Sequence, residues 1–368
     1  MINLINSIKL ADYRRNEVYK DGKLLLSNFS ESEQMLDLEK TKGNVQGAVE
    51  DFYRVKTNIK ADPWNTYMQS GDSFETRDGK LLMFDFDWWP VPDMGGQPEN
   101  WNEVFIYQLK GCNIACPFCF VDKFNNNGKV DHGAKYFTSE EIVDAFLKVR
   151  AEKKAQGVDI NVFRASGGEP SLVPEQWLNG LKIFKERGLD SEVYFQSDTN
   201  LLTGTALESW MKDGNMDADV FKQIAEYKNF GLLSCFKGTD PVNFSENSGC
   251  NPEMFLEQFY SFNLLAKSGI KVYPHLVNPN PKTLEGFMDK LAKEYGDEMY
   301  GMVHIFSIGM YGSVKGRLER AGVDVEQKTQ EWKDNNVRGQ ELLEEICQKR
   351  LGMGYKKMKR FEVIRDLF

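Results

Sequence analysis

The chain has 368 residues, 41% of them hydrophobic, which is enough to bury a full core in one large domain or two modest ones. Its formal net charge of −9 argues against broad binding of a phosphate backbone. The six cysteines form no disulfide framework, and the sequence contains neither a signal peptide nor an apolar run of membrane-spanning length. We therefore expect a cytoplasmic protein that does not enter a membrane.

Residues 1–101 lack regular alternation of strands and helices and are rich in turn formers and aromatics. Residues 84–87 alternate as a half-buried strand does. The region is predicted to be an N-terminal extension that either packs its aromatics on an end or edge of the following domain or covers an active site as a lid. Its tryptophans are Trp64, Trp88, Trp89 and Trp101.

From residue 102 onward, short apolar runs alternate with helical stretches. A capping box predicts a helix from Thr138, with Glu141 three residues on, and another helix begins at Pro174 and stops near Gly188. This alternation predicts an α/β fold with a parallel sheet. Because the six predicted strands are fewer than the eight that close a TIM barrel, we expect an open, partial (β/α)6 barrel. The predicted strands are 104–109, 160–164, 193–196, 231–236, 270–277 and 302–308, and two further helices are 252–268 and 282–295.

Three cysteines, Cys112, Cys116 and Cys119, follow the first predicted strand in a C-x3-C-x2-C spacing. A [4Fe–4S] cluster usually takes four thiolates, one per iron, so three from one loop leave the fourth iron open to a small molecule. Structural zinc is the competing interpretation, but it needs four ligands, and the nearest histidine, His132, does not follow at finger-like spacing. The position after a strand is where such sheets place active sites. The spacing therefore favours a [4Fe–4S] cluster.

This loop resembles the signature of the radical S-adenosylmethionine (radical SAM) superfamily, and Phe118 matches the aromatic residue usual there. Gly167-Gly168-Glu169-Pro170, directly after the second strand, is similar to the family's GGEP motif, whose backbone and Glu hold the amino group of S-adenosyl-L-methionine (SAM). Two glycines after a strand are ordinary turn chemistry when they stand alone. They also allow backbone to approach a ligand closely, because no Cβ blocks it.

Asp198-Thr199-Asn200 follows the third strand and resembles the Asp-Thr-Asn of glycyl-radical activating enzymes within that superfamily. The resemblance implies that Asp198 and Asn200 are polar groups of the SAM pocket. For Asp198 the alternative is a helix N-cap or a turn. Leu201 stands where the activase pattern usually has Gly.

Later positions depart from the activases. Cys235 replaces the Asp of their Asp-x-Lys, and Lys237 either pairs with the SAM carboxylate or is a solvated lysine at a strand end. Lys315 lies in a Gly-x-x-Lys like theirs and either faces substrate or ends a loop, but Gly309 stands where they often have His. We interpret His275, on an apolar strand, as a core residue.

The resemblance covers residues 102–322 and implies reductive cleavage of SAM at the cluster to a 5′-deoxyadenosyl radical that abstracts hydrogen from a substrate. It also implies an electron donor such as flavodoxin or ferredoxin. The substrate is left open between a small molecule, a nucleotide and a peptide. The alternatives are a glycyl-radical activase, an RNA-modifying enzyme and a non-enzymatic Fe–S electron-transfer protein. No catalytic residue is assigned from the sequence.

Residues 323–368 are predicted to form a helical, basic C-terminal tail. The simplest explanation of its lysines and arginines is a solvated helix face or tail. A docking patch for nucleic acid or an acidic partner is the alternative, which the acidic charge of the whole chain does not favour.

Overall fold

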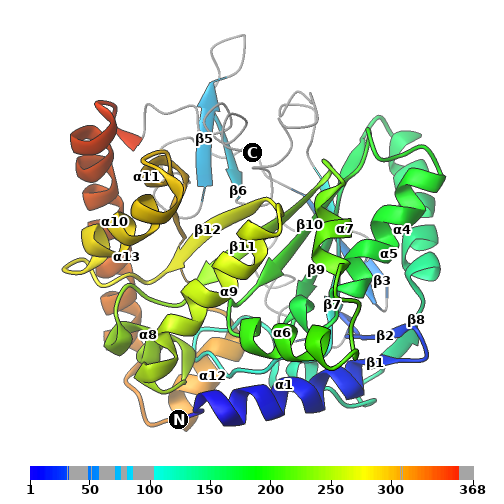
Figure 1. Cartoon of the computed structure of the whole chain (residues 1–368), viewed down its shortest axis with the longest axis horizontal. Coiled ribbons are helices and arrows are strands. Elements are labelled where there is room, and N and C mark those ends of the chain that lie inside the picture. The colour runs from blue at the N-terminus through cyan, green and yellow to red at the C-terminus, as the bar shows by residue number, and fades with distance from the viewer. Residues whose placement is uncertain are drawn as a thin grey trace.

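The fold is organised around one large sheet, seen in a computed structural model of the chain (Figure 1). The structure describes residues 1–30, 32, 49–50, 52–57, 71–75, 81–85, 103–306, 308 and 310–355. Trp64, Trp88, Trp89, Trp101 and Gly309 lie outside the described residues, as does part of the strand expected at 84–87.

The central part of the sheet is parallel and follows the order of the chain. Its strands are β7 (Glu103–Leu109), β9 (Ile160–Gly167), β10 (Tyr194–Thr199), β11 (Phe230–Phe236), β12 (Val272–Val277) and β13 (His304–Phe306). Each strand pairs in parallel with the next along the chain. The predicted α/β class is confirmed, and each predicted strand overlaps an observed one. The curvature of a partial barrel stays a prediction.

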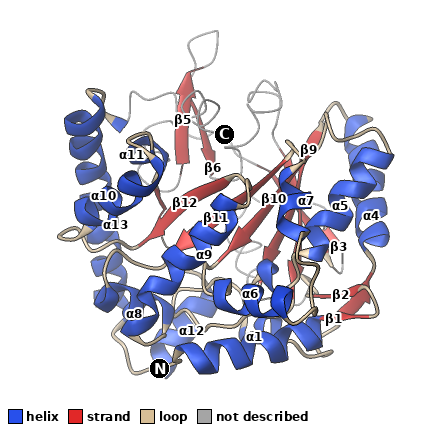
Figure 2. Cartoon of the chain, viewed as in Figure 1, coloured by secondary structure: helices blue, strands red, loops and turns tan. Residues whose placement is uncertain are grey.

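Helices fill the connections between these strands (Figure 2). They are α4 (Ser139–Lys154), α5 (Glu175–Glu186), α6 (Gly204–Lys212), α7 (Val220–Ala225), α8 (Pro241–Ser248), α9 (Phe255–Lys267), α10 (Leu284–Tyr295) and α11 (Met299–Met302). The predicted capping box is present at α4, where Glu141 N–H donates to Thr138 Oγ1 at 3.1 Å and Thr138 N–H donates to Glu141 Oε2 at 2.7 Å. Helices close in the chain pack together, α4 on α5, α5 on α7 and α6 on α9.

The two faces of the sheet carry different side chains. Phe105, Phe163 and Phe195, on neighbouring strands, are at most 2% exposed, and the ring centroid of Phe163 lies 5.6 Å from that of Phe105 and 4.9 Å from that of Phe195. These rings pack against aromatics of α4 and α5, and burying each contributes roughly 1.5–3 kcal/mol. Because side chains alternate along a strand, Ile106 and Arg164 project from the opposite face. That second face borders the candidate site.

The N-terminal region adds antiparallel strands beyond β7. Its elements are α1 (Leu4–Val18), β1 (Tyr19–Lys20), β2 (Lys23–Leu26), β3 (Val49–Glu50), β4 (Tyr53–Thr57), β5 (Gly71–Glu75) and β6 (Leu81–Asp85). Asp21 and Gly22, with φ of +52° and +76°, form the tight turn between β1 and β2, as Asp-Gly favours. β2 pairs with β8 (Lys135–Phe137), and both β2 and β4 pair with β7. β1–β4 therefore extend the large sheet, whereas β5 and β6 pair with each other in a separate two-stranded sheet.

The described residues that follow β13 form α12 (Gly312–Arg320) and α13 (Val325–Leu351). α13 packs on α10, α11 and β13 and ends at Gly352, whose φ is +70°. Lys349 lies 2.7 Å and Arg350 3.3 Å from the Glu285 carboxylate, so these basic residues form exposed ion pairs, as on a solvated face. None of the described helices is both long and apolar enough to span a membrane.

Candidate functional site

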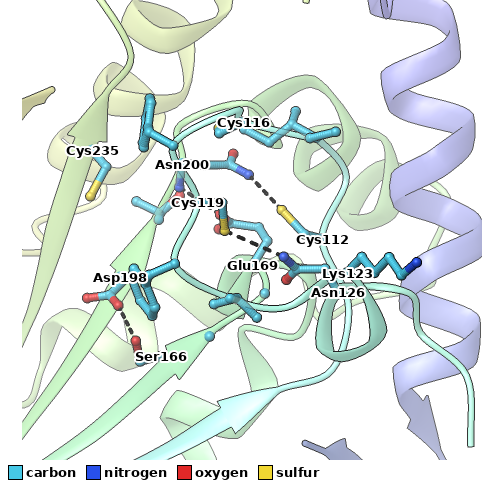
Figure 3. Close-up of a pocket in the computed structure, with 18 of the residues that line it drawn as sticks. Cys112, Cys116, Cys119, Lys123, Asn126, Ser166, Glu169, Asp198, Asn200 and Cys235 are labelled. Atoms are coloured by element: carbon cyan, nitrogen blue, oxygen red, sulfur yellow. Dashed lines mark hydrogen bonds between the residues drawn. The ribbon is translucent and has the colours of Figure 1, made fainter. Parts of the chain in front are cut away.

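A cavity of about 610 Å3 lies at the carboxyl ends of β7, β9, β10 and β11 (Figure 3). This is the size of a typical small-molecule site. Its wall brings together residues that the sequence places after four separate strands. Those predicted residues are Cys112, Cys116, Phe118, Cys119, Gly167, Gly168, Glu169, Asp198, Asn200 and Lys237, whereas Pro170 is buried beside the wall.

The three cysteines occupy the loop that follows β7. Cys116 is 8% exposed, and burial raises the pKa of its thiol to about 12, while burial raises the pKa of the Cys112 thiol well above its usual range. Asn200 Nδ2 lies 3.7 Å from Cys112 Sγ, and Asn126 Nδ2 lies 3.5 Å from Cys119 Sγ. Amide N–H groups thus face two of the sulfurs. Such donors suit thiolates whose charge is balanced by bound metal.

The three cysteines supply the type of donor that an iron–sulfur cluster takes. Among the described residues, no three His, Cys, Asp or Glu side chains are arranged to hold one metal ion. A lone ion draws all its ligands to about 2–2.3 Å from one point, whereas a [4Fe–4S] cluster takes one thiolate at each iron. His132, the nearest zinc candidate in the sequence, stacks on Phe124 with ring centroids 4.1 Å apart and is not part of the cavity wall. The residues present therefore fit the cluster in donor type.

Cys250 packs behind the cysteine loop. It is fully buried in an apolar group with Ile114, Cys116 and Phe244, although it is remote in sequence. Its Sγ lies 3.9 Å from the Ser248 carbonyl oxygen, and it takes no part in the cavity wall. Cys250 is thus a packing neighbour of the loop that does not line the cavity.

The glycine turn after β9 packs directly on the cysteine loop. Gly168 N–H donates to the Leu109 carbonyl at 2.9 Å, and Glu169 N–H donates to the Gly111 carbonyl at 2.6 Å. A Cβ on Gly168 would overlap the Gly111 carbonyl, and Gly167 has a φ of +93°, which favours glycine. These glycines therefore allow the glycine turn and the cysteine loop to approach each other closely.

Glu169 joins the turn to the next strand. It is 1% exposed, and Glu169 Oε2 accepts a 2.7 Å hydrogen bond from Asn200 N–H, while Oε1 accepts from the Ser171 hydroxyl. Burial raises the pKa of this carboxyl to about 7. Leu201, which stands where the activase pattern usually has Gly, has a φ of +61°, a left-handed backbone that favours glycine.

Asp198 is held by an arginine that sequence analysis did not select. Arg164 Nη2 lies 2.8 and 3.0 Å from the two Asp198 carboxylate oxygens, and Ser166 Oγ donates to the same carboxylate at 2.7 Å. Asp198 lies within β10, so the alternative of a helix N-cap is wrong. The period-two alternation of β9, which places Arg164 and Ser166 on one face, is the signal that could have identified the arginine.

Lys237 is buried at the end of β11. It is 7% exposed, and its Nζ lies 5.7 Å from the ring centroid of Phe118, so the alternative of a solvated lysine is wrong. Burial lowers its pKa, but the neighbouring Cys235, Cys116 and Glu169 outweigh burial and leave that pKa raised. Cys235 also lines the cavity, and burial raises the pKa of its thiol to about 11.

α12 contributes Arg317 rather than Lys315. The Lys315 side chain is 60% exposed, and its Nζ lies 3.8 Å from Glu319 Oε1. Lys315 lies within α12 and does not line the cavity, so it neither ends a loop nor faces the candidate site. Arg317 donates to the backbone carbonyls of Pro117 (3.4 Å), Cys119 and Val121. No pattern in the sequence pointed to this residue. His275 is fully buried on β12, as expected for a core histidine.

Comparisons with known proteins do not assign the chain to a family. No family model matches the chain, and no curated protein matches it. A solved structure described as native anSMEcpe with bound AdoMet is 15% identical with a TM-score of 0.36, over 67% of this chain and 65% of that one. The match thus spans less than two thirds of that protein, and a TM-score this low carries no argument about fold or function.

Proposed function

We propose that this chain is a radical SAM enzyme in which Cys112, Cys116 and Cys119 hold three irons of a [4Fe–4S] cluster and SAM binds the fourth. The observation that carries the proposal is that the cysteine loop and the Gly167–Pro170 turn, both similar to motifs of that superfamily, are hydrogen-bonded to each other beside one cavity. A three-cysteine loop with an open side suits a cluster that also binds a small molecule.

When bound, the cluster and SAM supply a one-electron reductive cleavage that yields a 5′-deoxyadenosyl radical able to abstract hydrogen. The residues of the chain bind and orient these two groups. Asn200 and Asn126 direct amide N–H groups at the sulfurs. In this proposal the Gly167–Pro170 turn holds the amino group of SAM, while Asp198, Asn200, Lys237 and the Phe118 ring form the remaining polar and aromatic wall. Glu169, Asn200 and Lys237 are each at most 7% exposed, which limits the access of water to these polar groups.

The proposal includes a partial (β/α)6 barrel as the core, residues 102–322, with residues 1–101 as an extension and 323–368 as a tail. It also includes a cytoplasmic location and a flavodoxin or ferredoxin as electron donor. The substrate is a small molecule, a nucleotide or a peptide. A purely electron-transferring Fe–S protein would need a fourth protein ligand. Cys250, which packs on the cysteine loop, takes no part in the cavity wall, whereas Cys235 lines it.

The test is product analysis. Protein reconstituted anaerobically with iron and sulfide, reduced with dithionite and given SAM, is expected to release 5′-deoxyadenosine and methionine. An intact cluster that produces neither would contradict the proposal and favour electron transfer. Transfer of deuterium from a labelled candidate compound into 5′-deoxyadenosine would then identify the substrate.

A further inference from the structure

Two arginines lie on the sheet face beneath the loops of the candidate site. Arg54 of β4 pairs across the sheet with Ile106 of β7, which pairs in turn with Arg164 of β9, so the three residues form one row. All three line the cavity. Arg164 precedes Gly167 by three residues, so about 10 Å of strand separates this row from the glycine turn. The row is therefore deeper along the strands than the proposed SAM-binding turn.

The two arginines differ in how their charge is balanced. Arg164 is paired with Asp198 at 2.8 Å. Arg54 is only 9% exposed, its Nε is buried without a hydrogen-bond partner, and its guanidinium carbon lies 5.6 Å from the ring centroid of Phe29. No carboxylate in the described part of the chain forms a salt bridge with it. Burial and the neighbouring Arg164 lower the pKa of Arg54 to about 10.

A buried guanidinium without a counter-ion is costly, because the lost hydration is not replaced. The described lining of the cavity also carries more basic than acidic side chains, although the chain has a net charge of −9. Its described lining has the basic residues Arg14, Arg54, Lys123, Arg164, Lys237 and Arg317 against the acidic residues Glu169 and Asp198. Both of these carboxylates already accept hydrogen bonds from protein donors. An anion in the cavity would complete the charge balance at Arg54.

We propose that Arg54, assisted by Arg164, binds an anionic group of the substrate, a carboxylate or a phosphate on a small molecule. The proposal rests on the proposed function for treating this cavity as the active site. It gives the N-terminal region a direct role, because β4 supplies the arginine. Planar guanidinium groups suit this task, since they recognise carboxylate and phosphate oxygens in pairs.

The experiment measures thermal unfolding of the full-length protein without SAM. Sodium chloride is replaced at constant ionic strength by sodium phosphate in one arm and by sodium acetate in another. An anion that binds the folded state raises the melting temperature, by about 2 °C at ten times its dissociation constant for a chain of this length. Phosphate and acetate distinguish a phosphorylated substrate from a carboxylic acid. Because SAM is absent, the result does not depend on whether the protein cleaves SAM.

Two variants make the result specific. Arg54→Met is expected to melt no lower than wild type in chloride, since it removes an uncompensated buried charge, and to lose the response to the anion. Arg338→Met, which removes an exposed arginine of α13, is expected to respond as wild type does. The proposal is overturned if neither anion stabilises wild type beyond chloride, if Arg54→Met keeps the response, or if Arg54→Met melts lower or fails to fold. It is also overturned if added SAM abolishes the response, because Arg54 would then serve the SAM carboxylate.

Discussion

At the scale of single residues, the proposed cluster ligands differ from Cys250 in that they line the cavity. Cys112, Cys116 and Cys119 line the cavity, whereas Cys250 packs behind Cys116. We predict that Cys116→Ala, after anaerobic reconstitution, retains only a small fraction of the iron bound by wild type, because a lost thiolate leaves a cluster corner without a ligand. Cys250→Ala is the matched control and should keep wild-type iron. Equal iron loss in both variants would contradict the ligand assignment.

Gly168 permits a close backbone contact with Gly111 that an amino acid with a Cβ atom would block. A methyl group there would overlap the Gly111 carbonyl, so Gly168→Ala must push the glycine turn away from the cysteine loop. We expect a loss of about 1–3 kcal/mol in the free energy of unfolding, measured by urea denaturation, and reduced iron after reconstitution.

The control for Gly168→Ala is Gly286→Ala, in the first turn of α10, where an added Cβ meets nothing within 4 Å. That substitution should stabilise the protein by about 0.5–1 kcal/mol, since alanine favours helix. A Gly168→Ala protein as stable as wild type, with full iron, would show that the two loops do not need their close contact.

At the scale of elements, α12 holds the cysteine loop through Arg317. Its guanidinium donates to three carbonyls of that loop, at Pro117, Cys119 and Val121. We predict that Arg317→Met lowers hydrogen-exchange protection in residues 112–121 by about tenfold, because hydrogen bonds from a charged donor contribute more than neutral ones. Arg320→Met, an exposed residue of the same helix, should leave this exchange unchanged. Similar exchange in both variants would mean that α12 does not fix the loop.

The sequence predicted elements well where the signal is local. Thr138 and Glu141 marked the start of α4, and β-branched and aromatic runs marked the parallel strands. It did not predict that β2 and β4 add to the edge of β7, because antiparallel pairing between remote segments leaves no local pattern. Arg54 was missed for this reason, since only the pairing of β4 with β7 brings it beside the cavity.

At the scale of the whole molecule, the parallel sheet explains why short motifs from distant parts of the chain form one site. The carboxyl ends of β7, β9, β10 and β11 lie at the same edge of the sheet, so Cys112, Glu169, Asp198 and Lys237 converge there. The motifs therefore predicted part of the cavity wall, but not Arg54, Arg164 or Arg317, which also line it. The side chains that fix it, such as Arg317, come from elements whose positions depend on tertiary packing, which no short motif encodes.

The central claim is that one iron of a four-iron cluster is open to SAM, and Mössbauer spectroscopy of protein reconstituted with iron-57 tests it most directly. We predict about four irons per chain, the number in a [4Fe–4S] cluster, with the signal of one iron changing when SAM is added and the others unaltered. Zinc in place of iron, or four irons whose spectrum does not respond to SAM, would contradict the account.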